Sequence, residues 1–384
     1  MKKFIVCTVF ALIVVLSAAC GTESPPVYVG VIDSGISSEV IGKDRVLSGK
    51  NYLTEEFDAG DTEDRIGHGT AVSAFISGSE AAGVEGVCPD VKLVPLVYTS
   101  VDSDKNVIGG TPELAAEAVL DAVDRFGCRI ICIASGTKQD NEKLRDAVKY
   151  AEDNGVLVVS CAGNSESDEP GMVFYPGGYE SVLCVGSSDE DGERASFSQN
   201  NEAVDILVQG TDLRLVTIKG TKIRGSGTSY SAAKAAGAAA RILQRYGGLD
   251  SEELKTALVD CSDIVLGMPV LDTGRLDTWE PDNSVIFITV MCIAGVAVLA
   301  TVVFIAVKKI KSNKGSKVTQ QMPQEEETTL REKGNRQTQQ TVETGVQRKG
   351  NRQTQQTVGT GVREKGNKSA TADRGRKTKA TKKK

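Results

Sequence analysis

Three side chains of the kinds that perform nucleophilic catalysis occur where apolar segments end or begin. The chain has 384 residues and a single histidine, His68, which lies in "GHGTAV". Asp33 follows the apolar run in "VGVIDSGI", and Ser229 lies in "GTSYSAAK". Histidine exchanges protons near neutral pH, a nucleophilic serine needs a base, and that base needs an orienting carboxylate. These three residues together predict acyl-transfer chemistry.

Each residue also has a purely structural interpretation. An Asp before Ser-Gly is common in the turn after a strand, and a lone histidine is often a packed or surface ring. Ser229 before an Ala-rich helix is typical of a helix cap, although a cap leaves the many small residues around it unexplained. Asn164, in "VSCAGNSE", adds an amide that is able to donate to an oxyanion. The joint pattern is far more specific than any one member.

Alternating strand and helix patterns must position these residues. Strands are expected at 27–33, 91–98, 129–135 and 156–164, and helices at 111–127 and 141–155. Pro95 favours an edge or irregular position for its strand. The alternation predicts an α/β fold of three layers, with a mostly parallel β-sheet and helices on both faces. Function in such sheets gathers at the carboxyl ends of the strands, where Asp33, Ser135 and Asn164 fall.

The motifs, in the order Asp, His, Asn, Ser, resemble those of the subtilisin-type serine proteases, the subtilase family. "GVCPDVKLVPL" and "YPGGYESVLCVGSSDEDGERASFSQ" match too, and the likeness covers residues 27 to about 258. The resemblance implies a serine endopeptidase acting on proteins or peptides. Ser229 would be its nucleophile, His68 its general base and acid, and Asp33 the carboxylate that orients His68. The oxyanion would be held by the Asn164 amide and the Ser229 N–H.

The resemblance also implies binding residues. It assigns substrate binding to Ala134, Ser135 and Gly136 beside the S1 pocket, and to Ala162 and Gly163 in the wall of that pocket. The sequence departs from the family at Ala71, where a second His is usual, and at Ala233–Lys234, where Pro-His is usual. Neither position carries the chemistry, so the predicted triad stands.

No cofactor or metal is expected. The loop 77–86 lacks the Asn that helps to bind calcium in secreted subtilisins, and the segment before Asp33 is short. We therefore expect a domain that folds without a propeptide and without a tight calcium site.

Export of the domain is predicted from the first apolar run. Lys2 and Lys3 precede an uncharged segment and then small residues, which is the layout of a signal peptide at 1–19. Cleavage there leaves Cys20 first, so lipidation, ordinary cleavage and an uncleaved anchor all remain open.

A second apolar run, 285–307, is uncharged and long enough to span a bilayer as a helix. Lys308, Lys309 and Lys311 follow it, so the positive-inside rule predicts a single-pass type I protein of the cell membrane. The preceding domain would be extracellular and the C-terminus cytoplasmic. This layout resembles the membrane-anchored subtilases of Gram-positive bacteria, mycosins included, in architecture only.

The basic tail, 308–384, has low complexity. "GNRQTQQTVETGVQRK" from Gly334 returns as "GNRQTQQTVGTGVREK" from Gly350, a repeat of 16 residues. Few large apolar residues are present, so we expect disorder. The favoured interpretation is a solvated, dispensable tail, and the alternative is that its lysines bind anionic lipid or a cytoplasmic partner. No nucleic-acid partner is expected.

Four regions result: the signal peptide (1–19), a peptidase domain (25–280), a transmembrane helix (285–307) and the tail (308–384). The predicted function is a membrane-tethered extracellular serine endopeptidase that processes exported proteins or peptides. Two alternatives stay open. One is a catalytically weak scaffold or a peptide-binding component of a secretion assembly, and the other is a lipoprotein binding module that depends on Cys20. Of the cysteines, Cys132, Cys161 and Cys184 are expected to be buried, and a bridge among Cys88, Cys128 and Cys261 is left open.

Overall fold

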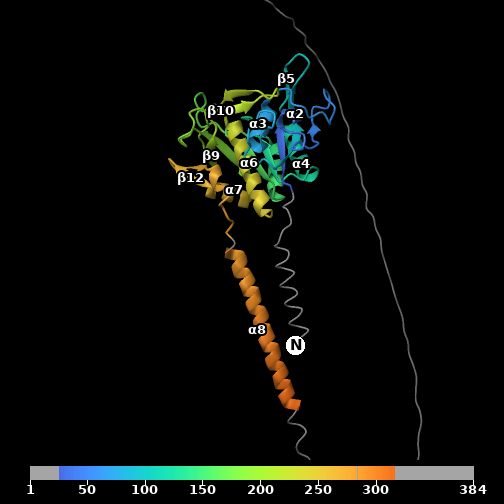
Figure 1. Cartoon of the computed structure of the whole chain (residues 1–384), viewed down its shortest axis with the longest axis vertical. Helices are drawn as coiled ribbons and strands as arrows, with labels where there is room; N and C mark the ends of the chain where they lie inside the picture. The colour runs from blue at the N-terminus through green and yellow to red at the C-terminus, as the bar shows by residue number, and fades with distance from the viewer. Residues whose placement is uncertain (1–25, 283, 316–384) are drawn as a thin grey trace, which may run out of the picture. The chain divides into compact units, whose positions relative to one another are not determined.

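The computed structural model describes residues 26–282 and 284–315 (Figure 1). The predicted signal peptide and the repeats of the tail lie outside these residues.

A nine-stranded sheet forms the centre of the domain. Its strand order is β12-β13-β9-β8-β7-β6-β1-β3-β2, and every neighbouring pair is parallel except β12 with β13. The predicted mostly parallel sheet is therefore confirmed. The strands are β1 (Tyr28–Asp33), β2 (Lys50–Asn51), β3 (Lys92–Val97), β6 (Ile130–Ile133), β7 (Leu157–Cys161), β8 (Val182–Ser188), β9 (Ile206–Gln209), β12 (Ser262–Val265) and β13 (Met268–Leu271).

Two small antiparallel sheets accompany the large one. They are formed by β4 (Thr99–Val101) with β5 (Val107–Gly109), and by β10 (Leu213–Val216) with β11 (Lys222–Gly225). The helices are α2 (Ser38–Ile41), α3 (His68–Ser77), α4 (Pro112–Asp124), α5 (Glu142–Asp153), α6 (Thr228–Tyr246), α7 (Ser251–Asp260), the short 3₁₀ helix η1 (Thr273–Arg275) and α8 (Ser284–Gly315).

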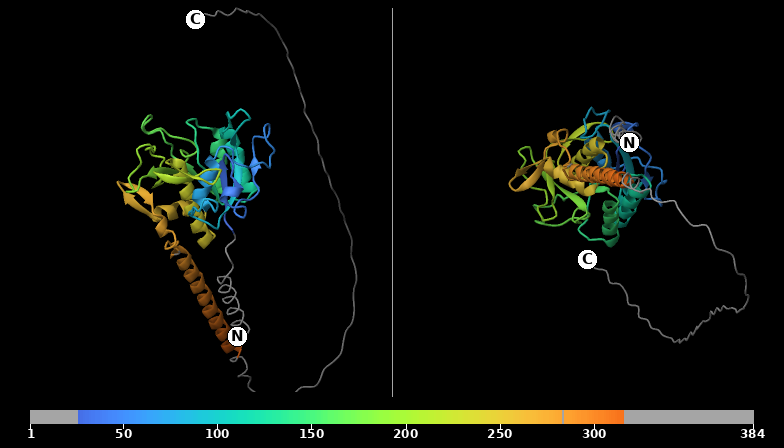
Figure 2. Two further views of the ribbon diagram at one scale, coloured as in Figure 1. Left: turned by 45° about the horizontal axis from the view of Figure 1, so that its top comes forward. Right: turned by 90° about the horizontal axis from the view of Figure 1, so that it is seen from below.

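Helices cover both faces of the sheet, as predicted. Successive side chains of a strand point to opposite faces, so Val31 joins one core cluster and Ile32 the other. The first cluster contains buried residues of α3, α6 and α7, and the second contains those of α4 and α5. The two sets of helices can be followed in Figures 1 and 2.

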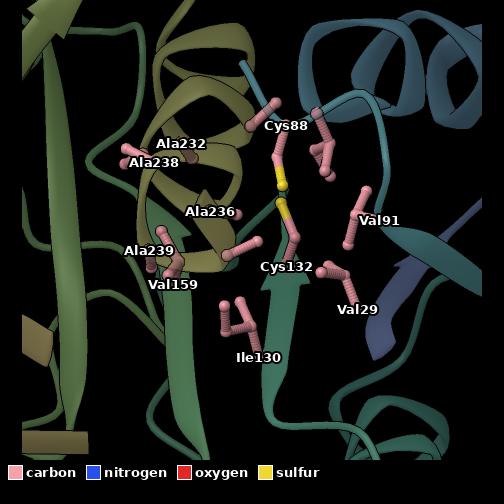
Figure 3. Packing of buried hydrophobic residues seen from close by; sticks show 14 of the residues in the cluster. Val29, Cys88, Val91, Ile130, Cys132, Val159, Ala232, Ala236, Ala238 and Ala239 are labelled. Carbon is pink, nitrogen blue, oxygen red and sulfur yellow. The ribbon is translucent and has the colours of Figure 1, made fainter. Parts of the chain in front are cut away.

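The Ala-rich helix α6 packs closely on the sheet. Figure 3 shows Ala236 and Ala239 among Ile130, Cys132 and Val159, and all of these side chains are buried. Small side chains let a helix approach a sheet closely, which explains the run of alanines after Ser229.

The cysteines of the domain are all buried and free. This confirms the expected burial of Cys132, Cys161 and Cys184. The bridge that the sequence left open is not formed, since Cys88, Cys128 and Cys261 carry free thiols. The Cys88 thiol donates to Gln244 Oε1 at 3.2 Å.

Pro95 lies in β3, which is second from the edge and pairs with both β1 and β2. The neighbouring N–H groups alternate in direction: Leu93 N donates to Arg45 O on the β2 side, and Lys92 N donates to Val27 O on the β1 side. Pro95 follows the pattern of Leu93, so its missing N–H falls on the side of the short strand β2. The expectation of an edge or irregular strand is therefore wrong, since β3 is not at the edge and keeps a continuous register with β1 through Pro95.

The helix α8 runs from Ser284 to Gly315 and so extends beyond the predicted span 285–307. Among the described residues it is the one helix long and apolar enough to cross a membrane, with 20 residues from Cys292 to Lys311 at a mean hydropathy of 2.2.

Candidate active site

The three residues of the predicted triad lie at the ends of secondary-structure elements. Asp33 is the last residue of β1, His68 is the first residue of α3, and Ser229 is the second residue of α6. A very close approach of α3 to the turn after β1 brings the first two together. At Gly69 an added Cβ would lie only 2.2 Å from the Gly35 carbonyl oxygen, so this contact needs glycine.

His68 and Asp33 form a hydrogen-bonded pair. The His68 Nδ1 atom lies 2.9 Å from both carboxylate oxygens of Asp33. The Asp33 side chain is 4% exposed, whereas that of His68 is 33% exposed. The negative charge of Asp33 raises the pKa of His68 above its ordinary value, against the opposing effect of burial. The bonded carboxylate also leaves Nε2 as the ring nitrogen available for proton exchange.

A second buried carboxylate, Asp64, holds the loop that presents His68. It accepts five hydrogen bonds, from Ser34 Oγ, Ile66 N, Gly67 N, Thr70 N and Thr70 Oγ1, at 2.7 to 2.9 Å. Ser34 Oγ in turn accepts a bond from Gly69 N at 3.0 Å. Asp64 therefore ties the start of α3 to the end of β1. Asp64 was not among the predicted site residues, because its position four residues before His68 is its only signal in the sequence.

Hydrogen bonds from Thr228 fix the orientation of the Asn164 side-chain amide. Its Oδ1 accepts from Thr228 N and from Thr228 Oγ1, both at 2.9 Å, and Thr228 Oγ1 also accepts from Gly163 N at 3.2 Å. Because Oδ1 is occupied, the Nδ2 hydrogens are the free donors of this amide. Ser229 follows Thr228 in the first turn of α6, where backbone N–H groups lack acceptors within the helix.

The Ser229 hydroxyl donates to the Ala134 carbonyl oxygen at 2.7 Å. Ser229 is therefore not the helix cap considered from the sequence, since the N-cap of α6 is Gly227.

A cleft of about 530 Å³ joins these groups. Eight of the nine predicted site residues line it, namely Asp33, His68, Ala134, Ser135, Gly136, Gly163, Asn164 and Ser229. Ala162 does not, because its side chain is 2% exposed and packs among Cys184, Val204 and Leu207. It is adjacent to Gly163 in the chain but points to the other side of the strand end.

The cleft also contains side chains that the sequence analysis did not single out. They include Ile66, Tyr98, Val107, Cys161 and Phe174. The Tyr98 hydroxyl lies 2.5 Å from Ser135 Oγ, and burial raises the pKa of Tyr98 to about 12. Tyr98 therefore stays neutral and fixes the Ser135 side chain at the cleft.

The two departures noted in the sequence are accommodated away from the cleft. Ala71 is buried within α3. The ammonium of Lys234 donates to Gln209 O at 2.9 Å and to Gln209 Oε1 at 2.6 Å, at the end of β9. Neither residue is part of the cleft lining.

The fold and the cleft are those of a subtilisin-like serine peptidase. The chain belongs to the subtilase family (peptidase S8), whose model matches residues 25–275. It is 30% identical to subtilisin DY of Bacillus licheniformis over 247 residues, which are 62% of this chain and 85% of that protein.

Solved structures show the same fold. A cold adapted subtilisin-like serine proteinase superposes with a TM-score of 0.56 at 26% identity, covering 66% of this chain and 91% of the other. MycP1 with the N-terminal propeptide removed gives a TM-score of 0.57 at 25% identity, covering 67% and 92%. The family implies peptide or protein substrates.

Proposed function

We propose that this chain is a membrane-tethered serine endopeptidase that hydrolyses peptide bonds of exported proteins or peptides through Asp33, His68 and Ser229. One observation carries the proposal: the His68 Nδ1 atom is 2.9 Å from both Asp33 oxygens, at the rim of the cleft that also contains Ser229. Asp33 fixes the imidazole tautomer in which Nε2 accepts a proton, and it stabilises the imidazolium that follows.

The chemistry requires Ser229 to change its hydrogen bond. In the described conformation its hydroxyl donates to Ala134 O, so a rotation about the Cα–Cβ bond must turn it towards His68. Such catalytic hydrogen bonds often form only once substrate is bound. Ser229 Oγ then attacks the substrate carbonyl carbon while His68 takes its proton. His68 later donates that proton to the leaving amine, and water releases the acyl group by the reverse sequence.

The oxyanion of the tetrahedral intermediate is bound by Asn164 Nδ2 and the Ser229 N–H. Thr228 supports this role, because it bonds Asn164 Oδ1 and leaves the amide N–H groups to face the cleft. Preorganised donors of this kind need no rearrangement when the negative charge develops.

Tethering is supported by α8. Its apolar side chains are exposed, as with Val298 at 64% and Phe304 at 68%, which suits lipid contact. Lys308, Lys309 and Lys311 follow its most apolar part, so the positive-inside rule places the C-terminal side in the cytoplasm and the peptidase domain outside.

The test uses the full-length chain in intact cells and a membrane-impermeant fluorophosphonate probe. An activated serine attacks the phosphorus of the probe, the P–F bond breaks with loss of fluoride, and the phosphonyl group stays bound to the serine oxygen. We expect the native chain to be labelled without permeabilisation and to be recovered in the membrane fraction. Ser229→Ala should show no label, whereas Ser226→Ala, which changes an exposed serine just before α6, should keep it.

Two failures have different meanings. A native chain that never reacts contradicts the enzyme, and it favours the non-cleaving scaffold or the peptide-binding component of a secretion assembly. A native chain that reacts only in permeabilised cells contradicts the outward orientation and leaves the enzyme standing.

We propose further that Arg45, rather than a tightly bound calcium ion, holds the loop 77–86. The Arg45 guanidinium donates to Ser77 O at 3.1 Å and pairs with Glu80 at 3.3 Å. The positive charge of Arg45 beside the Ser77 carbonyl oxygen would repel a calcium ion at this oxygen. Within the described part of the chain, no group of three or more His, Cys, Asp or Glu side chains is placed to hold a metal.

Adding a chelator is therefore expected to change the Tm of the domain by less than about 2 °C, under 1 kcal/mol for a domain of this size. Thermal unfolding with EGTA, with and without excess calcium, checks this. A fall of about 5 °C or more that calcium reverses would mean that a tight site exists, since saturating binding stabilises by several kcal/mol. EGTA preloaded with calcium serves as the control.

A further inference from the structure

The ring of Phe174 lies in the catalytic cleft beside the candidate oxyanion site. The cleft is lined on one side by Ser135 and Gly136 and on the other by Gly163 and Asn164, and Phe174 lines it as well. A pair of backbone hydrogen bonds fixes the segment that carries the ring. Thr137 N donates to Tyr175 O at 2.8 Å, and Tyr175 N donates to Thr137 O at 2.7 Å.

The contacts of Phe174 show that it occupies the space between the two walls. A Cβ added to Gly163 would lie 2.6 Å from Phe174 Cδ2 and 2.9 Å from Cε2, so the ring packs directly on the Gly163 backbone. A Cβ added to Gly136 would lie 3.3 Å from Phe174 Cβ. One side chain therefore contacts both walls, and glycine in each wall makes room for it.

The position of the scissile carbonyl follows from the proposed function, on which this inference rests. Ser229 Oγ and the donors on Asn164 and Ser229 must surround that carbonyl. The Cα atom of the P1 residue, on the acyl side, is bonded to the carbonyl carbon, and its side chain begins at the next atom. The space between Gly136 and Gly163 belongs to the same cleft as Ser229 and Asn164, and we take it as the place that this side chain enters.

We propose that Phe174 fills most of this space, which is the S1 pocket, and that it makes the enzyme specific for small P1 residues: Gly, Ala and Ser. A methyl or hydroxymethyl group fits above the ring. An aromatic or long aliphatic side chain requires either the ring or the Gly163 strand end to move, and both are packed. Phe174 is thus a specificity-determining residue rather than a catalytic one.

The test compares two peptidyl diphenyl phosphonates that differ only in their P1 side chain, methyl or benzyl. Ser229 Oγ forms a bond to phosphorus and a phenoxide leaves as phenol, so the second-order rate of inactivation reports P1 fit without a known substrate. The native chain should react with the methyl probe at least about 100-fold faster, since a mismatch of a single methylene in a pocket already costs about 10- to 200-fold.

Phe174→Ala should reduce this preference at least about 10-fold by accelerating the benzyl probe, and Phe174→Leu should give an intermediate ratio. Phe126→Ala is the matched control, because it removes a partly buried ring that packs against the core cluster of α4 and α5 and does not line the cleft. Its methyl-to-benzyl ratio should equal that of the native chain.

The inference is overturned if the native chain reacts with the benzyl probe as fast as with the methyl probe. It is also overturned if the ratio is unchanged in both Phe174 variants while a small alkyl fluorophosphonate labels them at the native rate, which shows that they fold. A native chain that the small fluorophosphonate does not label contradicts the proposed function instead, so the two failures are distinguishable.

Discussion

Replacing His68 with alanine is expected to lower kcat by about 10⁶, the loss that the related subtilisin suffers when its histidine is removed. His68 is the only histidine of the chain, so no second imidazole is present to take its place. Its side chain is 33% exposed at the start of α3, and its removal leaves the core clusters intact. Steady-state hydrolysis of an activated peptide ester by the purified full-length chain in detergent measures the effect.

The variant must be shown to fold. We expect the Tm of His68→Ala to stay within a few degrees of the native value, and His68→Gln to be equally inactive because an amide is not a base at neutral pH. Ser229→Ala gives the background rate. Residual activity of either histidine variant well above this background would contradict the assignment of His68 as the general base.

Replacing Asp33 with asparagine is expected to lower kcat by about 10⁴ and to change the pH dependence. The amide presents a donor as well as an acceptor, so it stabilises the wrong imidazole tautomer. The Asp33 carboxylate raises the pKa of His68, and the base works only when neutral. In the native enzyme kcat/KM should therefore rise through a pKa above the ordinary value of about 6.5.

The loss of the Asp33 charge in Asp33→Asn should lower the pKa of His68. Without the carboxylate the imidazolium loses its main stabilisation, while burial still disfavours the charged form. The acid limb of the profile should move to lower pH. Profiles of kcat/KM from about pH 5 to 9, corrected by Ser229→Ala, measure the shift. A flat native profile, or an acid limb that stays in place in Asp33→Asn, would be evidence against the Asp33–His68 pair.

Much of the fold was predictable because its signals are local. The helix that begins at Pro112 is capped by Thr111, whose Oγ1 accepts from Leu114 N at 3.3 Å. The next helix is followed by Gly155, which has a φ of 71°. Both signals involve residues within a few positions of each other. The same holds for the alternation of strands and helices. Asp33, Ser135 and Asn164 were expected at the carboxyl ends of parallel strands, where the structure has them.

Other features depend on how distant segments pack. Asp64 is one carboxylate among many in the sequence. Four of its five donors lie within six residues of it, and the approach of α3 to β1 adds the fifth, Ser34 Oγ, which links Asp64 to the end of β1. The resemblance to the subtilases implied that Ala162 lies in the pocket wall, but in the structure its side chain packs among Cys184, Val204 and Leu207 beyond the end of β7. The alternation of apolar residues predicts which face of the sheet each side chain of a strand points to. It does not predict the direction of side chains after the strand ends.

The sequence by itself determined the candidate chemistry, since a chain with one histidine and the ordered Asp, His, Asn and Ser motifs has one choice of base. It also determined the family, the mostly parallel sheet and the apolar helix. Tertiary structure alone decided the shape of the cleft. Phe174 and Gly136 meet there because the Thr137–Tyr175 hydrogen bonds align two segments that are distant in the sequence, and a local sequence pattern does not predict such a contact.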